Sequence, residues 1–150
     1  LAQTINVLQA VILTNKEKII LTPTYHVMEM YNVHQNATLL PITVKTNDYI
    51  FNDQKLPAVS ASASKDKNGS MHISIINIDA EKKQDITINA EGAVFKTITG
   101  RILSSPKIQD HNTFDEPEKI KPVSFTGFRY NGSTISLQLP PASVVVLEVK

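Results

Sequence analysis

The side chains best suited to chemistry in this sequence are carboxylates, because two of them at a suitable separation can hydrolyse a glycosidic bond. Glu29 lies in a segment with helical spacing. The other candidates gather in turn-rich segments: Asp79, Glu81, Asp110, Asp115, Glu116 and Glu118. Acidic residues in turns usually accept hydrogen bonds from the backbone or face solvent. No two of them stand at the end of an apolar strand, where burial would separate their pKa values. The sequence therefore predicts no catalytic pair.

Histidine and serine could supply a metal site or a nucleophile. The four histidines are His26, His34, His72 and His111. His26 and His34 are too far apart for a metal pair on adjacent helical turns, and no His-Glu-x-x-His motif occurs. Ser60, Ser62 and Ser64 alternate along a strand-like segment and lack the Gly-x-Ser-x-Gly elbow. We expect structural roles for these residues, with no metal and no cofactor.

A sugar-binding surface would need exposed aromatic rings. The sequence contains no tryptophan, and its four tyrosines are scattered at Tyr25, Tyr31, Tyr49 and Tyr130. A carbohydrate-binding module is therefore the alternative interpretation and not the main one.

The composition is that of a globular domain. The 150 residues are 41% apolar and 19% charged, and a net charge of +1 gives no electrostatic case for nucleic acid or an anionic membrane. The absence of cysteine excludes disulfides and thiolate metal sites but leaves the compartment open. No apolar run reaches membrane-spanning length. The chain begins at Leu1 without a signal-peptide pattern, and we interpret it as a piece of a longer protein.

The stretch 70–79 predicts an interior strand. Met71, Ile73 and Ile75 fall on one face, and Ile76 and Ile78 on the other. A strand that is apolar on both faces usually has neighbours on both edges. Asn68-Gly69 before it is a turn signal.

The N-terminal part of the sequence predicts helices. Leu1, Ile5, Leu8 and Ile12 form one stripe at helical spacing, so we expect a helix over 1–13. This stripe must pack on the β-domain or on another copy, or else the helix is poorly ordered. Residues 19–22 are extended up to Pro23. Thr22-Pro-Thr24 is a helix-start pattern, with Thr22 or Thr24 as N-cap, and a short helix is expected over 26–34.

From residue 38 onward the spacing predicts an all-β sandwich or barrel. In the first strand, 39–45, we expect Leu40, Ile42 and Val44 to point inward. Residues 104–119 read as a long loop, and Asn131-Gly132 as a hairpin turn. The remaining strands are expected over 49–51, 57–64, 85–90, 94–103, 123–128, 134–139 and 143–149.

Four motifs resemble one enzyme family. Ala2-Gln-Thr-Ile-Asn-Val-Leu-Gln-Ala10 and Leu21-Thr-Pro-Thr-Tyr-His-Val-Met-Glu-Met-Tyr31 resemble the C-terminal third of family 51 α-L-arabinofuranosidases. The loop His111-Asn-Thr-Phe-Asp-Glu-Pro117 with Lys121-Pro-Val123, and the final Leu139-Pro-Pro-Ala-Ser-Val-Val-Val-Leu147, are similar to later segments of that family. The similarity covers nearly the whole chain.

The resemblance implies an (α/β)8 barrel that carries the active site, followed by a jelly-roll β-sandwich. Residues 1–37 would be the end of the barrel and the connecting segment, and residues 38–150 the sandwich. The family hydrolyses terminal α-L-arabinofuranosyl groups of arabinan and arabinoxylan with retention, using two barrel glutamates that lie outside this chain. Gln3 matches a family glutamine that hydrogen-bonds arabinose, a task that suits a neutral amide.

The resemblance therefore implies no catalytic residue in this chain. Its expected partners are the catalytic barrel of the same polypeptide and, in the parent enzyme, further copies in a homo-oligomer. The main interpretation is a non-catalytic sandwich domain, with a carbohydrate-binding module as the alternative.

Overall fold

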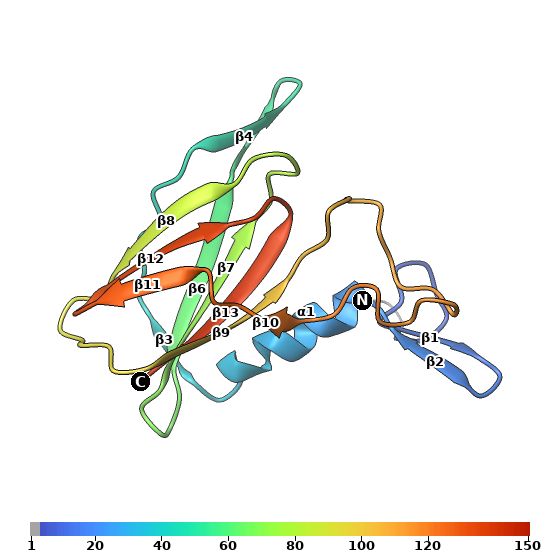
Figure 1. Cartoon of the computed structure of the whole chain (residues 1–150), viewed down its shortest axis with the longest axis horizontal. Helices are drawn as coiled ribbons and strands as arrows, with labels where there is room; N and C mark the ends of the chain where they lie inside the picture. Colours follow the sequence, from blue (N-terminus) through green and yellow to red (C-terminus); the bar gives the residue numbers. More distant parts are fainter. Residues whose placement is uncertain (1–3) are drawn as a thin grey trace.

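Two antiparallel sheets pack against each other in the computed structural model, which describes residues 4–150 (Figure 1). The larger sheet has the order β10-β9-β13-β7-β6-β3, and the smaller one the order β11-β12-β8. The large sheet contains β3 (Thr38–Leu40), β6 (Val59–Lys65), β7 (Met71–Asn77), β9 (Ile98–Leu103), β10 (Val123–Ser124) and β13 (Ser143–Val149). The small sheet contains β8 (Gln84–Asn89), β11 (Phe128–Asn131) and β12 (Thr134–Leu139). The prediction of an all-β sandwich is confirmed.

The strand predicted to be interior is β7, and it lies between β13 and β6. Ile73 and Ile75 point into the main core, as the two-residue period predicts. On the opposite face His72 and Ser74 are also buried. Both faces of this strand are therefore covered, although one of them is polar.

The main core fills the space between the sheets. Along β12, Ile135, Leu137 and Leu139 are buried and alternate with exposed Ser136 and Gln138. These side chains belong to one cluster with Val145 and Leu147 of β13 in the other sheet. Each large aliphatic side chain removed from water in this way contributes about 1.5–3 kcal/mol.

The prediction of a helix over 1–13 is wrong for the residues that the structure describes. The chain instead forms a hairpin of β1 (Ile12–Asn15) and β2 (Lys18–Leu21), and Asn6 and Gln9 have positive φ angles of 51° and 59°. A right-handed helix cannot continue through such residues. The many β-branched side chains of this segment also favour extended backbone. The stripe assigned to Ile5, Leu8 and Ile12 does not exist, and Leu1 lies outside the described residues.

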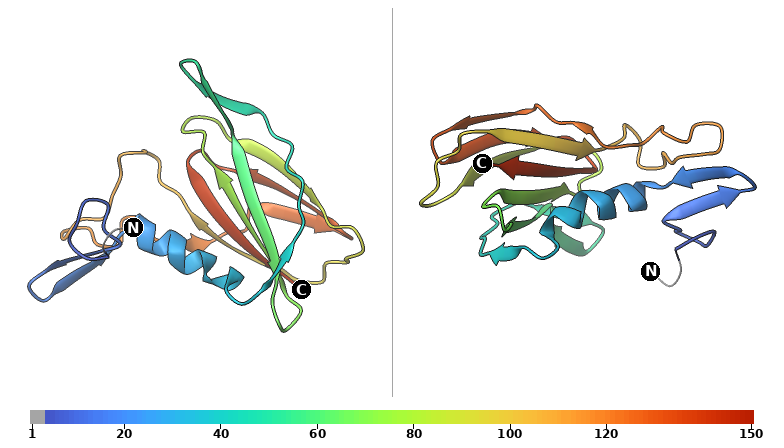
Figure 2. Two further views of the ribbon diagram at one scale, coloured as in Figure 1. Left: turned by 180° about the vertical axis from the view of Figure 1, so that it is seen from behind. Right: turned by 90° about the horizontal axis from the view of Figure 1, so that it is seen from below.

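The second helix is confirmed, with an earlier start. Helix α1 (Pro23–Tyr31) continues into the 3₁₀ turn η1 (Asn32–His34), and Pro23 occupies its first turn. Thr22 stands at the N-cap position, but its side chain makes no capping hydrogen bond. The helix lies against the outer face of the large sheet (Figure 2). Its Met30 is buried in a second apolar cluster with Leu103, Ile120 and Val146.

The strand predicted over 39–45 ends earlier than expected. Only β3 pairs in the sheet, and residues 41–47 belong to no strand. Pro41 has no backbone N–H and ends the ladder. Ile42 and Val44, expected to point inward, are 44% and 43% exposed.

An arm of two strands follows this segment. It consists of β4 (Asp48–Phe51), which was predicted, and β5 (Gln54–Pro57), which was not. The arm extends away from the sandwich (Figure 1). The long loop after β9 and the turn at Asn131-Gly132 are confirmed. Of the stretch 94–103, only residues from Ile98 onward form a strand. No helix among residues 4–150 is long and apolar enough to cross a membrane.

Candidate functional site

The N-terminal hairpin is the part of the structure nearest in sequence to Gln3, the one predicted substrate-binding residue. Gln3 itself lies outside the described residues. The carbonyl oxygen of Thr4 accepts hydrogen bonds from the backbone N–H groups of Val11 and Ile12, both at 3.0 Å. The Asn6 side chain donates to the hydroxyl of Thr14 and accepts from its backbone N–H. These bonds hold Asn6 in its positive-φ conformation and fix the backbone directly after Gln3.

A buried asparagine joins this hairpin to the long loop. Asn112 is only 4% exposed. Its side-chain nitrogen donates to the carbonyl oxygens of Leu21 and Ile120 at 2.8 and 2.9 Å. Its oxygen accepts the backbone N–H of Ile120 at 2.7 Å. The amide thus satisfies backbone groups on both segments, which would otherwise be buried without partners.

Thr22 joins the same hairpin to α1. Its hydroxyl lies 2.9 Å from the carbonyl oxygens of Ala10 and Val11 and makes no hydrogen bond to the first turn of the helix. The threonine that the sequence assigned to helix capping is therefore used to hold the hairpin. We call the assembly of residues 4–22, α1 and the loop 104–122 the junction.

The junction exposes apolar side chains. Ile5 is 52% exposed, Leu8 95% and Ile19 64%. All three belong to the hairpin region, whereas Ala10, Val11 and Ile20 of the same region are buried. Exposed aliphatic side chains on an ordered, hydrogen-bonded scaffold are typical of a surface that another domain covers.

An ion pair fastens α1 to the large sheet. The Arg101 guanidinium on β9 donates two hydrogen bonds, both 2.8 Å, to the two carboxylate oxygens of Glu29. These bonds lower the pKa of Glu29 and raise the pKa of Arg101. A carboxylate held ionised in this way cannot serve as a general acid near neutral pH.

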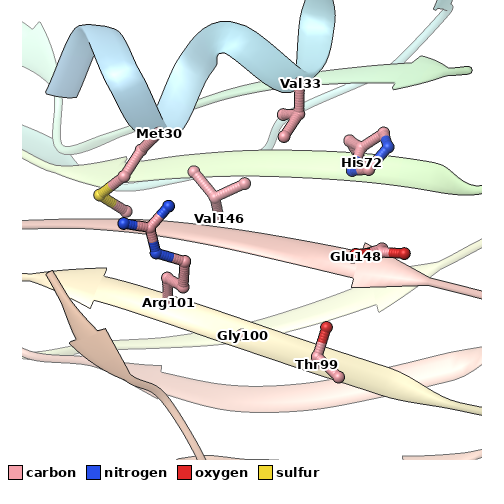
Figure 3. Close-up of a pocket in the computed structure, with 8 residues that line it drawn as sticks. All are labelled: Met30, Val33, His72, Thr99, Gly100, Arg101, Val146 and Glu148. Atoms are coloured by element: carbon pink, nitrogen blue, oxygen red, sulfur yellow. The ribbon is translucent and has the colours of Figure 1, made fainter. Parts of the chain in front are cut away.

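Between α1 and the sheet lies a shallow hollow with a volume of about 80 Å³ (Figure 3). Met30 and Val33 form its helical side, and His72 and Glu148 lie on the strands below. Sites for small organic ligands usually have volumes of roughly 300–1,000 Å³. The hollow is therefore too small for a sugar ring.

The His34 side chain makes structural contacts. Nδ1 of His34 lies 2.7 Å from the Ser64 hydroxyl, and Nε2 lies 2.6 Å from the Ser74 hydroxyl, so the ring joins η1 to β6 and β7. Burial lowers the pKa of His34, and the neighbouring His72 adds to this effect. The described residues contain no group of three or more His, Cys, Asp and Glu that could hold a metal ion. The predicted structural role of His34 is confirmed.

Comparison with known proteins decides the family. A family model described as the alpha-L-arabinofuranosidase C-terminal domain matches residues 1–143. The chain belongs to this family. It is 44% identical to the intracellular exo-alpha-L-arabinofuranosidase of Bacteroides ovatus over an alignment of 151 positions, which covers 100% of this chain and 29% of that protein.

Solved structures of whole enzymes agree with this assignment. The GH51 arabinofuranosidase of Xanthomonas axonopodis pv. citri is 41% identical with a TM-score of 0.95, and the match covers 99% of this chain and 30% of that one. The alpha-L-arabinofuranosidase of Thermotoga maritima is 26% identical with a TM-score of 0.82, covering 99% of this chain and 33% of that one. This chain thus spans about a third or less of the length of these relatives.

The acidic residues of the arabinofuranosidase domain serve its fold. The Asp79 carboxylate accepts the backbone N–H groups of Glu81 and Lys82, which lower its pKa. The hydroxyl of Ser105, then the ammonium group of Lys119, lower the pKa of Asp110. Hydrolysis would need one carboxyl with a raised pKa beside an ionised one. Among residues 4–150, every carboxylate with a shifted pKa has a lowered one, so none could act as the acid of such a pair.

Sequence reasoning missed the structural roles of three residues that shape this domain. Asn112 was part of the loop that resembles the family, but no role was assigned to it. A signal was present, since an asparagine in a long loop with few apolar residues is a natural partner for buried backbone groups. Arg101 and Glu29 are 72 positions apart and belong to different elements, so no local pattern pairs them.

Proposed function

We propose that this chain is the non-catalytic C-terminal sandwich of a longer retaining enzyme that removes non-reducing terminal α-L-arabinofuranosyl residues from arabinan, arabinoxylan and related polysaccharides. The observation that carries this proposal is the 44% identity, along the whole chain, to an exo-alpha-L-arabinofuranosidase of which the match covers 29%. The acid/base and nucleophile would come from the catalytic barrel of the same polypeptide. Two carboxyl groups about 5–5.5 Å apart give retention in such a site.

The junction supports different roles for the barrel and the sandwich within that enzyme. We assign residues 1–37 to the end of the barrel and the connection, and residues 38–150 to the sandwich. Ile5, Leu8 and Ile19 would then be covered by the barrel, with a gain of about 1.5–3 kcal/mol for each fully buried side chain. The sandwich would stabilise the barrel and perform no bond-breaking itself.

Gln3 is proposed to hydrogen-bond the arabinose ring in the full-length enzyme, because its neutral amide can both donate to and accept from hydroxyl groups. In the full-length enzyme, Gln3→Ala should lower kcat/KM about 10- to 100-fold, the effect of one or two lost hydrogen bonds. Gln9→Ala is the matched control, since Gln9 is an exposed glutamine in the segment before β1. Equal activity of both variants would remove Gln3 from the site.

The arm of β4 and β5 supports a homo-oligomer of the parent enzyme. Ile50 is 58% exposed, Phe51 66% and Leu56 56%. An isolated two-stranded hairpin is only marginally stable in water, so contact with another copy would stabilise it. Phe51→Ser should reduce the mass of the assembly that the full-length enzyme forms, as measured by sedimentation. Lys55→Ser on the same arm should leave that mass unchanged. An unchanged mass for Phe51→Ser would exclude the arm as the contact.

One experiment tests the main proposal against its alternative. The full-length polypeptide and residues 1–150 are each incubated with an aryl α-L-arabinofuranoside, and each is titrated with arabinan. We expect hydrolysis by the full-length polypeptide only, and no arabinan binding by residues 1–150. Binding by residues 1–150 would favour a carbohydrate-binding module. Hydrolysis that stays with residues 1–150 through repurification would contradict the assignment of a non-catalytic domain.

A further inference from the structure

Two asparagines of this chain are each followed by glycine, at Asn68-Gly69 and at Asn131-Gly132. Both asparagines and both glycines are exposed. In such a pair the backbone nitrogen of the glycine can attack the side-chain carbonyl carbon of the asparagine, because glycine has no Cβ atom to hinder the approach. The two pairs therefore share a possible reaction, and the turn around each pair decides how readily it proceeds.

The reaction converts the side-chain amide into a carboxyl group, and it is one reason why asparagine is a thermolabile residue. The glycine nitrogen forms a bond to Cγ of the asparagine while the bond from Cγ to Nδ2 breaks. The proton of the glycine nitrogen passes through water to the departing amide, which leaves as ammonia. Water then opens the resulting succinimide ring at either carbonyl carbon, which yields aspartate or isoaspartate. In isoaspartate the main chain runs through the side chain and gains a carbon atom.

The turn between β6 and β7 protects the first pair. The backbone N–H of Gly69 donates to the carbonyl oxygen of Asp66 at 3.1 Å. The Asp66 carboxylate also accepts the backbone N–H groups of Asn68 and Ser70, both at 2.9 Å. Attack by the Gly69 nitrogen has to break the first of these bonds. The net free energy of one such bond corresponds to a reaction about 2- to 10-fold slower.

The turn between β11 and β12 leaves the second pair open to reaction. Gly132 lies outside both strands, and its N–H donates to no backbone acceptor among residues 4–150. Thr134 is opposite Asn131, but its hydroxyl donates to Oδ1 of Asn89 at 3.0 Å and so does not hold the Asn131 side chain. The attacking nitrogen of this pair therefore has no backbone hydrogen bond to give up.

The carbonyl groups of the same turn are attached to the main core. The carbonyl oxygen of Gly132 accepts the N–H of Phe95 at 2.9 Å, and that of Ser133 accepts the N–H of Ala90 at 3.0 Å. Phe95 belongs to the main core, and Ala90 packs against it. A two-residue turn has a fixed length, so an added main-chain carbon at Asn131 must displace the edge strand β11 or release these contacts.

We propose that Asn131 is a site of spontaneous deamidation in the folded protein, and that isoaspartate at this position detaches β11 and its turn from the core. Water is the only co-reactant. Asn68 is the comparison within the same molecule, because it has the same glycine neighbour but lies in a turn that engages the glycine nitrogen.

Peptide mapping of the full-length polypeptide tests the first half of the proposal. One sample is aged folded at mildly alkaline pH, and another is aged at the same pH in guanidinium chloride. Cleavage after Lys67 and Arg129 places the two asparagines in separate peptides. Mass spectrometry then follows deamidation of each peptide, and chromatography separates the aspartate form from the isoaspartate form.

The ratio of the Asn131 rate to the Asn68 rate should be about 2- to 10-fold higher in the folded sample than in the denaturant, the effect of the bond to Gly69. The denatured sample corrects for the different residues that precede the two pairs. An equal or lower ratio in the folded sample would overturn the assignment of Asn131 as the preferred site.

Thermal unfolding before and after ageing tests the second half. The aged wild type should have a lower midpoint temperature than the fresh protein. Asn131→Gln should keep its midpoint through the same ageing, since the longer side chain closes the corresponding ring far more slowly. Fresh Asn131→Asp carries the new charge without the added carbon and should unfold like the fresh wild type. Equal losses on ageing for the wild type and Asn131→Gln, or a midpoint of fresh Asn131→Asp as low as that of the aged wild type, would refute the role of isoaspartate.

Discussion

The side-chain nitrogen of Asn112 donates to the carbonyl oxygen of Leu21 at 2.8 Å, across 91 positions of sequence. With its two bonds to Ile120, this contact makes one side chain the link between the N-terminal hairpin and the long loop after β9. The hairpin region buries Ala10, Val11 and Ile20, and the loop buries Ile120. The Asn112 side chain adds direct polar contacts between the two segments.

Asn112→Ala should lower the free energy of unfolding by about 2–4 kcal/mol, because it leaves the buried backbone groups of Ile120 and the partly buried carbonyl of Leu21 without partners. Urea unfolding followed by circular dichroism measures the change. Asn131→Ala, at an exposed position in the β11–β12 hairpin, should change the stability by less than about 0.5 kcal/mol. Equal losses for the two variants would show that Asn112 is not the link.

The ion pair between Glu29 and Arg101 should contribute little to stability, although its geometry is bidentate. Both side chains are more than two fifths exposed, so Glu29→Gln should cost at most about 1 kcal/mol at neutral pH. Because the folded state lowers the pKa of Glu29 below 4.5, the contribution is complete above that value. It is lost as the pH falls through the folded-state pKa.

Urea unfolding of the wild type and Glu29→Gln between pH 7 and pH 2.5 tests this expectation. The stability difference should shrink at acid pH and also in high salt, which screens exposed charges. Glu91→Gln is the control, since Glu91 is exposed and takes part in no ion pair between described residues. A difference that persists undiminished at the lowest pH would show that the ion pair is not its source.

His34 should make the stability of the domain pH-dependent in the mildly acidic range. Burial lowers its pKa below 6.5 in the folded state, so the unfolded chain binds a proton more readily. The neutral ring therefore stabilises the fold fully above about pH 6.5. This stabilisation falls as the pH drops from there toward the folded-state pKa.

His34→Gln should weaken the fold by about 1–3 kcal/mol at pH 7.5, because the hydroxyls of Ser64 and Ser74 lose the ring between them. The variant should also lose less stability than the wild type between pH 7.5 and pH 5. The exposed His111 provides the control variant, His111→Gln. Identical pH profiles for the wild type and His34→Gln would contradict the role of this ring.

The period of apolar side chains was sufficient to predict the strands that form the core. The bounds of β12 and β13 were predicted correctly, since alternation at Ile135, Leu137 and Leu139 and the valine run after Pro140-Pro141 leave little choice. The interior position of β7 followed from its isoleucines. Burial of these residues depends on the strand period alone, which is a local property.

The errors arose where partners distant in sequence decide the conformation. Ile5, Leu8 and Ile12 have helical spacing, yet the bonds from Val11 and Ile12 to Thr4 close a loop that no helix contains. Ser64 belongs to a run of alternating serines with no local sign of burial, but His34 covers it from η1. In each case tertiary hydrogen bonds override the local pattern. Gln3 stays a prediction, because it lies outside the described residues.

Gly100 should tolerate no side chain, because β9 passes close to the segment after β10. A Cβ atom at this position would lie 2.9 Å from the carbonyl oxygen of Phe125 and 3.0 Å from Cδ2 of Leu147. The carbonyl oxygen cannot move freely, since it belongs to the backbone of a packed segment. Gly100→Ala should therefore cost about 1–3 kcal/mol, the usual penalty for overpacking.

The control is Thr99→Ala on the same strand. The Thr99 side chain is exposed, so this variant should change stability by less than about 0.5 kcal/mol. Thermal unfolding of both variants compares the two costs, and a Gly100→Ala variant as stable as Thr99→Ala would show that β9 has more room than these distances indicate.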